Sequence, residues 1–253
     1  MKRFLLLLFL PLLFSCVTQE KVSNPALIAH AGGAIDGNVY TNSREALEQA
    51  VSNGYTFIEF DLIFTSDSVL VAAHSWSDFN KMTGYEEWGD SVPTFDDFAE
   101  RRILGRYRPL SATDIDSFFC ENENLYLVTD KESSPEVLGT YFPSLKERMV
   151  VEAFSYEHYC RLIDDGYFRV LYSCMASDVY STLAKNLFFD KLFPGRRIEW
   201  LALHTSGLEY SFFKILNRVR RFNVALFTVD SYDDIPVEYS GRFDMIYTNS
   251  LLP

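Results

Sequence analysis

Two acidic residues inside an apolar segment are the strongest candidates for chemistry in this chain. Glu59 and Asp61 stand two positions apart in residues 56–63, where most neighbouring residues are apolar. If this segment is a strand, both carboxylates leave on one face, because side chains alternate along a strand. Adjacent buried carboxylates are costly unless a cation neutralises them, and such oxygen ligands suit Ca²⁺ or Mg²⁺. The pair predicts a site for one divalent cation, with two salt bridges to basic residues as the alternative.

Two histidines end the apolar segments on either side of this pair. His30 precedes Ala31 and the glycines Gly32 and Gly33, and His74 closes the segment after the carboxylates. Glycines allow backbone N–H groups to approach an anionic ligand closely. Imidazoles titrate near neutral pH, so one can accept a proton while the other donates one. Beside a divalent cation, this arrangement suits phosphodiester chemistry.

Short apolar segments alternate with longer amphipathic ones along the chain, which predicts parallel βα units in a single (β/α)₈ TIM barrel of α/β class. An open doubly wound sheet is the alternative. Active sites of such barrels lie where the strands end. The connection after the second segment is the exception, since it is only residues 66–68. Strands are expected at 26–30, 56–63, 69–74, 125–129, 149–154, 169–174, 200–204 and 224–229. Helices are expected at 43–53, 112–120, 134–147, 156–164, 178–192 and 210–221.

The first residues have the pattern of an export signal. Lys2 and Arg3 precede an apolar run over residues 4–14, followed by Ser15 and Cys16. This run is too short for a spanning helix. Leu-Phe-Ser-Cys16 resembles a bacterial lipobox, which implies a signal at 1–15, a lipidated tether at 16–25 and the barrel at 26–253. The resemblance predicts a lipid-anchored protein outside the cytoplasm in a bacterial cell envelope. The alternative is an ordinary secretory signal with an incidental cysteine.

Charge and cysteine content narrow the partners. The 253 residues carry a formal net charge of -12, which would repel nucleic acid and anionic headgroups, so no nucleic-acid partner is expected. After Cys16, the three cysteines Cys120, Cys160 and Cys174 allow at most one disulfide and are expected to be small buried hydrophobes.

The chain resembles the glycerophosphodiester phosphodiesterases, a family within the phosphatidylinositol phospholipase C-like barrels. Their His-Arg-Gly and Pro-Glu-Asn-Thr motifs are similar to His30-Ala31-Gly32 and Tyr40-Thr41-Asn42-Ser43. Their Glu-x-Asp and His-Asp motifs are similar to Glu59-Phe60-Asp61 and His74-Ser75, and Glu-x-Lys to Thr129-Asp130-Lys131. Residues 227–230 and 243–249 look like the last strand and the closing motif.

The resemblance implies roles for these residues. His30 and His74 would be the acid–base pair, Glu59 and Asp61 the cation ligands, and Lys131 a charge against phosphate oxygens. A glycerol hydroxyl would attack phosphorus and expel the alcohol, and the cyclic phosphate formed would then be hydrolysed. The expected partner is a small phosphodiester.

Three positions depart from the family pattern. Ala31 stands for the phosphate-binding arginine, Ser75 for the aspartate after the second histidine, and Thr129 for the third metal carboxylate. In a regular strand Asp130 should point away from the site. We therefore expect Glu152, a polar residue in an apolar segment, to be a candidate third ligand, against an ordinary buried ion pair.

Three further residues are weaker candidates for substrate binding. Asn42 could order the first loop or cap the following helix, Trp76 could form a wall or pack within its loop, and His204 could face the mouth or lie in the core. Two other functions stay open. The same residues could act on an inositol lipid, a sphingolipid or a sugar-phosphate, or the protein could be a non-catalytic surface lipoprotein that binds a ligand.

Overall fold

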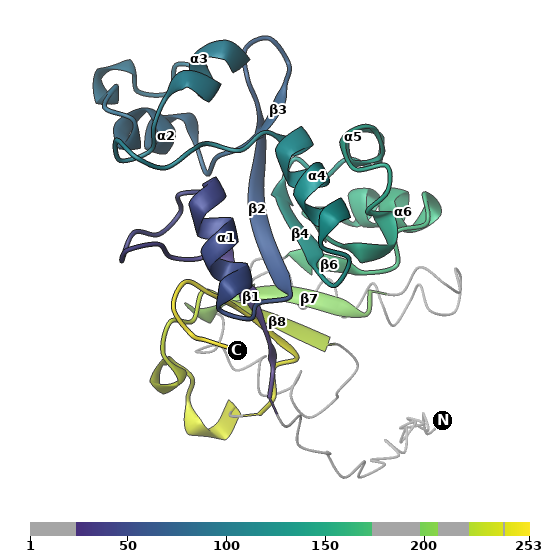
Figure 1. Cartoon of the computed structure of the whole chain (residues 1–253). Helices are drawn as coiled ribbons and strands as arrows, with labels where there is room; N and C mark the ends of the chain where they lie inside the picture. The colour runs from purple at the N-terminus through teal and green to yellow at the C-terminus, as the bar shows by residue number, and fades with distance from the viewer. Residues whose placement is uncertain (1–23, 174–197, 207–222, 240) are drawn as a thin grey trace, which may run out of the picture.

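A computed structural model describes residues 24–173, 198–206, 223–239 and 241–253, and shows a closed barrel surrounded by helices (Figure 1). Eight parallel strands form the barrel, which confirms the predicted fold class. They are β1 (Ala26–Ala29), β2 (Phe57–Phe64), β4 (Tyr126–Lys131), β5 (Met149–Ala153), β6 (Val170–Ser173), β7 (Trp200–His204), β8 (Asn223–Phe227) and β9 (Met245–Thr248).

The first strand closes the barrel. β1 pairs in parallel with β2 on one side, where Ile28 lies opposite Phe57, and with β9 on the other, where Ile28 lies opposite Tyr247. The remaining strands pair in chain order from β2 through β4 to β9. All carboxyl ends of the barrel strands therefore meet at one mouth.

One expected barrel strand lies outside the ring. The segment predicted at 69–74 forms β3 (Leu70–Ala72), which pairs antiparallel with β2 and places Ile63 opposite Val71. The three residues 66–68 can close a hairpin but cannot cross back to a parallel strand. The eighth barrel strand is instead β9, which lies within the segment that resembles the family's closing motif.

Helices cover the outside of the barrel, mostly where the sequence predicts them. α1 begins after Ser43, whose hydroxyl accepts a hydrogen bond from the Ala46 N–H, and it ends before Gly54 at φ 91°. The helix expected over 134–147 is shorter, and the helices expected at 178–192 and 210–221 lie outside the described residues. The helices are α1 (Arg44–Ser52), α2 (Trp76–Met82), α3 (Phe95–Glu100), α4 (Ala112–Glu121), α5 (Pro135–Tyr141) and α6 (Tyr156–Asp164). Short 3₁₀ turns lie at His30–Gly32, Glu86–Trp88, Lys146–Arg148, Tyr232–Asp234 and Val237–Tyr239.

Three apolar clusters correspond to three layers. The inward-facing residues of the barrel pack on one another, among them Ile28, Val128 and Leu171. Outward residues of the strands, such as Ile58 and Phe60, pack against the helices. The third cluster lies beneath α2 and α3 and contains Phe79 and Phe98. The strand residues therefore alternate between barrel interior and helix layer, as period-two patterning requires.

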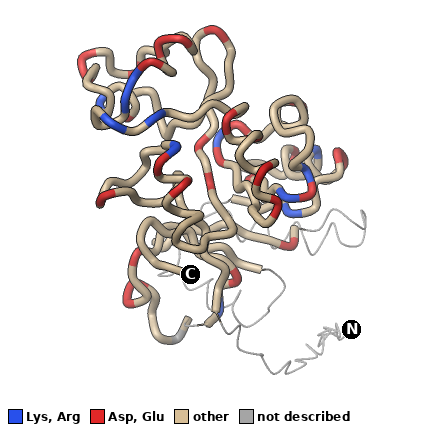
Figure 2. Tube along the Cα trace, viewed as in Figure 1, with Lys and Arg blue, Asp and Glu red and all other residues tan. Residues whose placement is uncertain are grey.

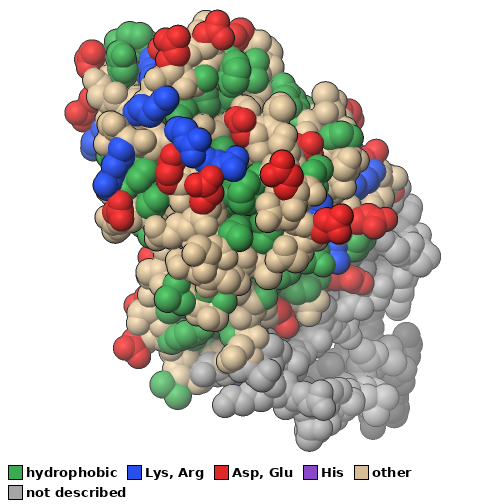
Figure 3. All heavy atoms as spheres, viewed as in Figure 1, with side chains coloured by type: hydrophobic (Ala, Val, Ile, Leu, Met, Phe, Trp, Pro, Cys, Tyr) green, Lys and Arg blue, Asp and Glu red, His purple; other side chains and the backbone are tan. Residues whose placement is uncertain are grey.

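Residues 76–110 form an insertion that carries α2 and α3 and lies beyond the barrel with β3 (Figure 1). Basic residues gather in this part of the trace with acidic residues among them (Figure 2), and the space-filling view shows both signs on the same face (Figure 3). Several are ion-paired, including Arg106 with Asp36 and Arg108 with Glu45. This face is therefore a mixed surface and not a basic one.

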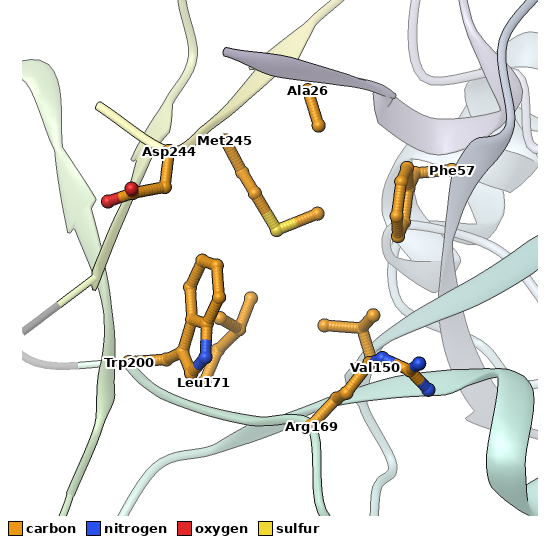
Figure 4. Close-up of a pocket in the computed structure, with 8 residues that line it drawn as sticks. All are labelled: Ala26, Phe57, Val150, Arg169, Leu171, Trp200, Asp244 and Met245. Atoms are coloured by element: carbon orange, nitrogen blue, oxygen red, sulfur yellow. The ribbon is translucent and has the colours of Figure 1, made fainter. Parts of the chain in front are cut away.

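The floor of the barrel, where the strands begin, holds an apolar cavity of about 260 Å³. Figure 4 shows the eight side chains that surround it: Ala26, Phe57, Val150, Arg169, Leu171, Trp200, Asp244 and Met245. Most of them are apolar residues at the first or second position of their strands. The floor is therefore the opposite end of the barrel from His30, Glu59 and Asp61.

The described part of the chain contains two cysteines, Cys120 and Cys160. Cys120 and Cys160 are free, and Cys120 is exposed, so the expectation that it is buried is wrong: it lies on the solvent side of α4. Cys174 and the segment with Cys16 lie outside the described residues. No helix within the described ranges is both long and apolar enough to cross a bilayer.

Candidate active site

Three carboxylates meet at the mouth of the barrel. Glu59 and Asp61 are each 1% exposed and leave the inner face of β2. Asp130, on the neighbouring strand β4, lies opposite Asp61 in the register. One oxygen from each of the three groups lies within 4.8 Å of the others. This spacing allows one cation to contact all three residues.

Asp130 corrects an expectation from the sequence. Thr129 pairs with Phe60, which packs in the outer layer, so Thr129 faces the helices while Val128 and Asp130 face the interior. The expectation that Asp130 points away is therefore wrong, because it assumed that Thr129 faced inward. The β2–β4 register decides which of these neighbouring side chains reaches the mouth.

Glu152 does not join the carboxylate group that the described residues form. It lies inside β5 and accepts a hydrogen bond from the Tyr247 hydroxyl. Burial raises its pKa to about 8, with a further contribution from the negative charge of Asp130. The geometry thus gives Asp130 the place that we expected Glu152 to take.

The electrostatics of the carboxylates fit a divalent cation. Glu59 Oε2 accepts a hydrogen bond from the Ala31 N–H at 2.7 Å, whereas Glu59 Oε1 is buried and has no partner among the described residues. Burial, with the charges of Asp61 and Asp130, raises the pKa of Glu59 well above its usual value. A cation against the free oxygen would neutralise this charge, and an all-oxygen donor set suits Ca²⁺ or Mg²⁺.

Lys131 also reaches the carboxylates. Its φ of 63° breaks the strand geometry at the end of β4, and its Nζ lies 3.4 Å from Asp61 Oδ1. The Lys131 side chain is 29% exposed. A positive charge is therefore present at the mouth and is open to solvent, as contact with phosphate oxygens would require.

The first loop supports the carboxylates with its backbone and with Asn42. Asn42 is buried, donates from Nδ2 to Asp61 Oδ2 at 3.0 Å and accepts from the Asp61 N–H at 3.2 Å. The Gly33 N–H donates to the His30 carbonyl at 2.8 Å. Gly32 has φ 81°, and a Cβ there would lie 3.3 Å from the Phe60 ring. These contacts give the glycines and Asn42 a role in holding the loop against β2.

Both histidines lie against the ring of Tyr40. Its ring centroid is 4.7 Å from that of His30 and 5.0 Å from that of His74. His30 Nε2 is 3.9 Å from Glu59 Oε2, and its Nδ1 is 3.3 Å from Thr228 Oγ1. Burial lowers the pKa of His30, an effect that the negative charge of Asp61 opposes. The structure thus brings both imidazoles to the mouth with the carboxylates.

Asp78 is a site residue that the sequence analysis missed. His74 Nδ1 lies 2.7 Å from Asp78 Oδ2, which also accepts a hydrogen bond from the Ser75 hydroxyl at 2.6 Å. These bonds lower the pKa of Asp78. Ser75 in turn caps α2 by accepting from the Asp78 N–H. The pattern Ser75-x-x-Asp78 is a capping signal that could have drawn attention to this carboxylate.

Trp76 and His204 lie less close to the chemistry. Trp76 begins α2 and packs edge-on against Phe79 and Phe98 inside the insertion. His204 ends β7, is exposed, and its Nδ1 is 2.8 Å from the Ser206 hydroxyl. The contacts of Trp76 are those of loop packing, whereas His204 remains at the rim.

Solved structures with the same fold share the barrel at low sequence identity. A glycerophosphodiester phosphodiesterase from Parabacteroides distasonis has a TM-score of 0.63 and 18% identity, covering 89% of this chain and 93% of its own. The Thermotoga maritima enzyme of the same name has a TM-score of 0.60 and 15% identity, covering 89% and 95%. An Oleispira antarctica phosphodiesterase, solved with its product sn-glycerol-3-phosphate, has a TM-score of 0.63 and 14% identity, covering 89% and 93%. No curated protein sequence matches the chain.

Histidines and carboxylates meet at the mouth of this eight-stranded parallel barrel, and the family match and the similar structures assign the protein to the phosphoric diester hydrolases. Residues 31–153, which carry most of this site, match the glycerophosphoryl diester phosphodiesterase family. Residues 31–153, just under half of the chain, are thus assigned to that family.

Proposed function

We propose that this protein hydrolyses glycerophosphodiesters or closely related small phosphodiesters with the help of one Ca²⁺ or Mg²⁺ ion. The observation that carries the proposal is the group formed by Glu59, Asp61 and Asp130, with a buried oxygen of Glu59 left without a partner. The family match over residues 31–153 and the product bound to the Oleispira antarctica relative support the choice of substrate.

The three carboxylates would hold the cation, which when bound polarises a phosphoryl oxygen and stabilises the charge that develops there. Lys131 lies beside Asp61, where its ammonium can bind a second phosphate oxygen. The cation and Lys131 would supply positive potential at the mouth of a chain whose formal net charge is -12.

The histidines would move the protons. The lowered pKa of His30 favours its neutral imidazole, which can accept a proton from the attacking hydroxyl. Asp78 fixes the Nδ1 side of His74, so the opposite nitrogen is left to donate a proton to the departing alcohol. Both imidazoles would act beside Tyr40, which contacts each of them.

Thr129, in place of the family's third carboxylate, would by itself favour a non-catalytic protein. Asp130 offers a carboxylate to the same group from the next position, which supports a catalytic one. At the position of the family's phosphate-binding arginine, this chain has the uncharged residue Ala31. We therefore include inositol lipids, sphingolipids and sugar-phosphates among the diesters to be tested.

The test is a screen of phosphodiesters with added Ca²⁺ or Mg²⁺, in which wild type is compared with His30→Ala and His74→Ala. We expect the wild type to release an alcohol from glycerophosphodiesters and both variants to lose this activity. Turnover that persists in EDTA, or in both variants, would contradict the assignment. A cyclic phosphate among the products would support attack by the neighbouring glycerol hydroxyl.

We also propose that Cys16 is lipidated and anchors the protein outside the cytoplasm of a bacterial cell. The support is the lipobox-like Leu-Phe-Ser-Cys16 after an apolar run. Cys16→Ser should release the protein from the membrane fraction, because stable anchoring requires more than one acyl chain. A variant that stays in the membrane fraction would refute lipidation at this residue.

A further inference from the structure

The ring of Tyr40 contacts both candidate acid–base residues. Its ring meets His30 in an edge-on arrangement at 74° and His74 in a tilted arrangement at 59°. The hydroxyl is close enough to Asp61 and Glu59 for their charges to affect its pKa. A group that both histidines approach must therefore lie against Tyr40.

The backbone around Tyr40 is held in an unfavourable conformation. Tyr40 has φ 58° and Asn42 has φ 48°, a left-handed region that is costly for residues other than glycine. The Asn42 N–H donates to the Ala31 carbonyl at 3.1 Å, and the Asn42 side chain makes two hydrogen bonds with Asp61. These contacts tie the loop to the strand that carries the carboxylates, so Tyr40 is fixed relative to them.

The hydroxyl of Tyr40 is a neutral hydrogen-bond donor. The Thr228 side chain hydrogen-bonds it and also lies 3.3 Å from His30 Nδ1. Burial raises the pKa of Tyr40, so the phenol keeps its proton at neutral pH. In the motif comparison Tyr40 stands at the position of the family proline, and Ala31 stands at that of the phosphate-binding arginine. Compared with the family motif, the mouth thus gains the hydroxyl of a tyrosine and loses the positive charge of an arginine.

We propose that Tyr40 is a specificity-determining residue that contacts the phosphodiester between His30 and His74, with its hydroxyl donating to a phosphate oxygen and its ring limiting the alcohol groups that fit. This inference rests on the proposed function. An uncharged donor would position the phosphate without adding to the positive charge of the cation and Lys131.

Two substitutions separate the hydroxyl from the ring. Tyr40→Phe removes the donor and keeps the ring packed between the imidazoles, whereas Tyr40→Ala removes both. We expect Tyr40→Phe to lower kcat/KM for glycerophosphodiesters roughly tenfold, the size of one hydrogen bond to a charged group. Tyr40→Ala should also change the ranking of diesters that differ only in the leaving alcohol.

A binding measurement makes the test independent of turnover. sn-Glycerol 3-phosphate with Mg²⁺ or Ca²⁺ is the probe, titrated by calorimetry into wild type, Tyr40→Phe and Tyr40→Ala. Tyr141→Phe is the matched control, because its hydroxyl contacts the backbone of Ser68 and Leu70 on the outer side of the barrel. Unchanged thermal unfolding of the Tyr40 variants would show that they fold.

The outcomes distinguish this inference from the proposed function. Weaker binding of the probe in both Tyr40 variants, with unchanged binding in Tyr141→Phe, supports the inference. This holds even if the wild type turns over no diester, although that lack of turnover would refute the proposed hydrolase function. Equal affinity and equal diester ranking in wild type and both Tyr40 variants would overturn the inference and leave the hydrolase intact. A wild type that binds no probe overturns both.

Discussion

The two ends of the barrel are built from the same strands but have opposite character. Along the inner face of β2, Phe57 lies at the floor, whereas Glu59 and Asp61 belong to the group of carboxylates at the mouth. The floor surrounds an apolar cavity (Figure 4). The mouth gathers three carboxylates that repel one another. Two steps along one strand therefore separate residues that stabilise the fold from residues that cost stability.

This contrast shows where folding and function compete. Apolar burial at the floor stabilises the barrel, and a change there should alter stability without altering the chemistry. At the mouth, the raised pKa of Glu59 shows that its charge is unfavourable without a counter-ion. A change there should abolish activity while leaving the fold intact or making it more stable.

The largest expected effect is the loss of activity in Glu59→Gln. The amide keeps the shape of the side chain but removes the charge that would hold the cation, so kcat should fall by roughly a thousandfold. Thermal unfolding checks the cause: Mg²⁺ or Ca²⁺ should raise the midpoint of the wild type and leave that of Glu59→Gln unchanged.

Asp244→Asn is the matched control at the floor, where Asp244 accepts a hydrogen bond from the Val224 N–H. It should keep both the activity and the response to cations. A Glu59→Gln enzyme with wild-type turnover would remove the functional distinction between the two ends.

At the floor, Leu171→Ala should destabilise the protein by about 2–5 kcal/mol, because Leu171 is 1% exposed and borders a cavity that the truncation would enlarge. Denaturant unfolding measures this loss. The kcat of the folded fraction should match that of the wild type. A large fall in kcat at a temperature where the variant is fully folded would show that the floor and the mouth are coupled.

Glu152, in the barrel interior, provides a prediction about how the stability of the protein depends on pH. Its pKa of about 8 in the folded protein exceeds the usual value of 4.5, so between these values the folded state keeps a proton that the unfolded state has released. Its contribution to stability is therefore complete below pH 4.5 and is lost as the pH rises through 8.

In EDTA, Glu152→Gln should reduce this pH dependence by up to about 1.4 kcal/mol per pH unit between pH 5 and pH 8. Denaturant unfolding at a series of pH values tests this directly. Identical slopes for wild type and variant would show that Glu152 is not the group responsible.

The smallest effect is expected for Asp78→Asn. Loss of the carboxylate beside His74 Nδ1 should lower kcat roughly tenfold with little change in KM, because the imidazole loses its orientation. The effect on stability should stay below about 1 kcal/mol, since both side chains are 40% exposed or more.

Asp97→Asn is a matched control in the same insertion, where Asp97 pairs with Arg101 away from the mouth. It should leave kcat unchanged. An Asp78→Asn enzyme with the same kcat as this control would restrict Asp78 to capping α2.

The sequence was sufficient for features that depend on local pattern. The alternation around Glu59 and Asp61 gave their common face, and the helix expected at 43–53 is α1 (Arg44–Ser52). It was insufficient where tertiary pairing decides. Asp130 faces the mouth because of the β2–β4 register, and β3 lies outside the barrel because a three-residue connection forms a hairpin.

Tyr40 and Asp78 could not be assigned for related reasons. The left-handed backbone of Tyr40 is maintained by contacts of Asn42 with a strand about twenty residues further along the chain. Asp78 reaches His74 only because α2 begins at once after β3. Neither contact follows from residue type and spacing alone.

The β2–β3 hairpin gives the second histidine an unusual attachment. His74 follows β3 and precedes the insertion of residues 76–110, whose apolar cluster also includes Ala46 of α1 and Val71 of β3. Changes on the solvent side of this insertion would leave Glu59, Asp61 and Asp130 on their own strands. Diversification of the accepted alcohol could then proceed in evolution, or by design, without rebuilding the carboxylate centre.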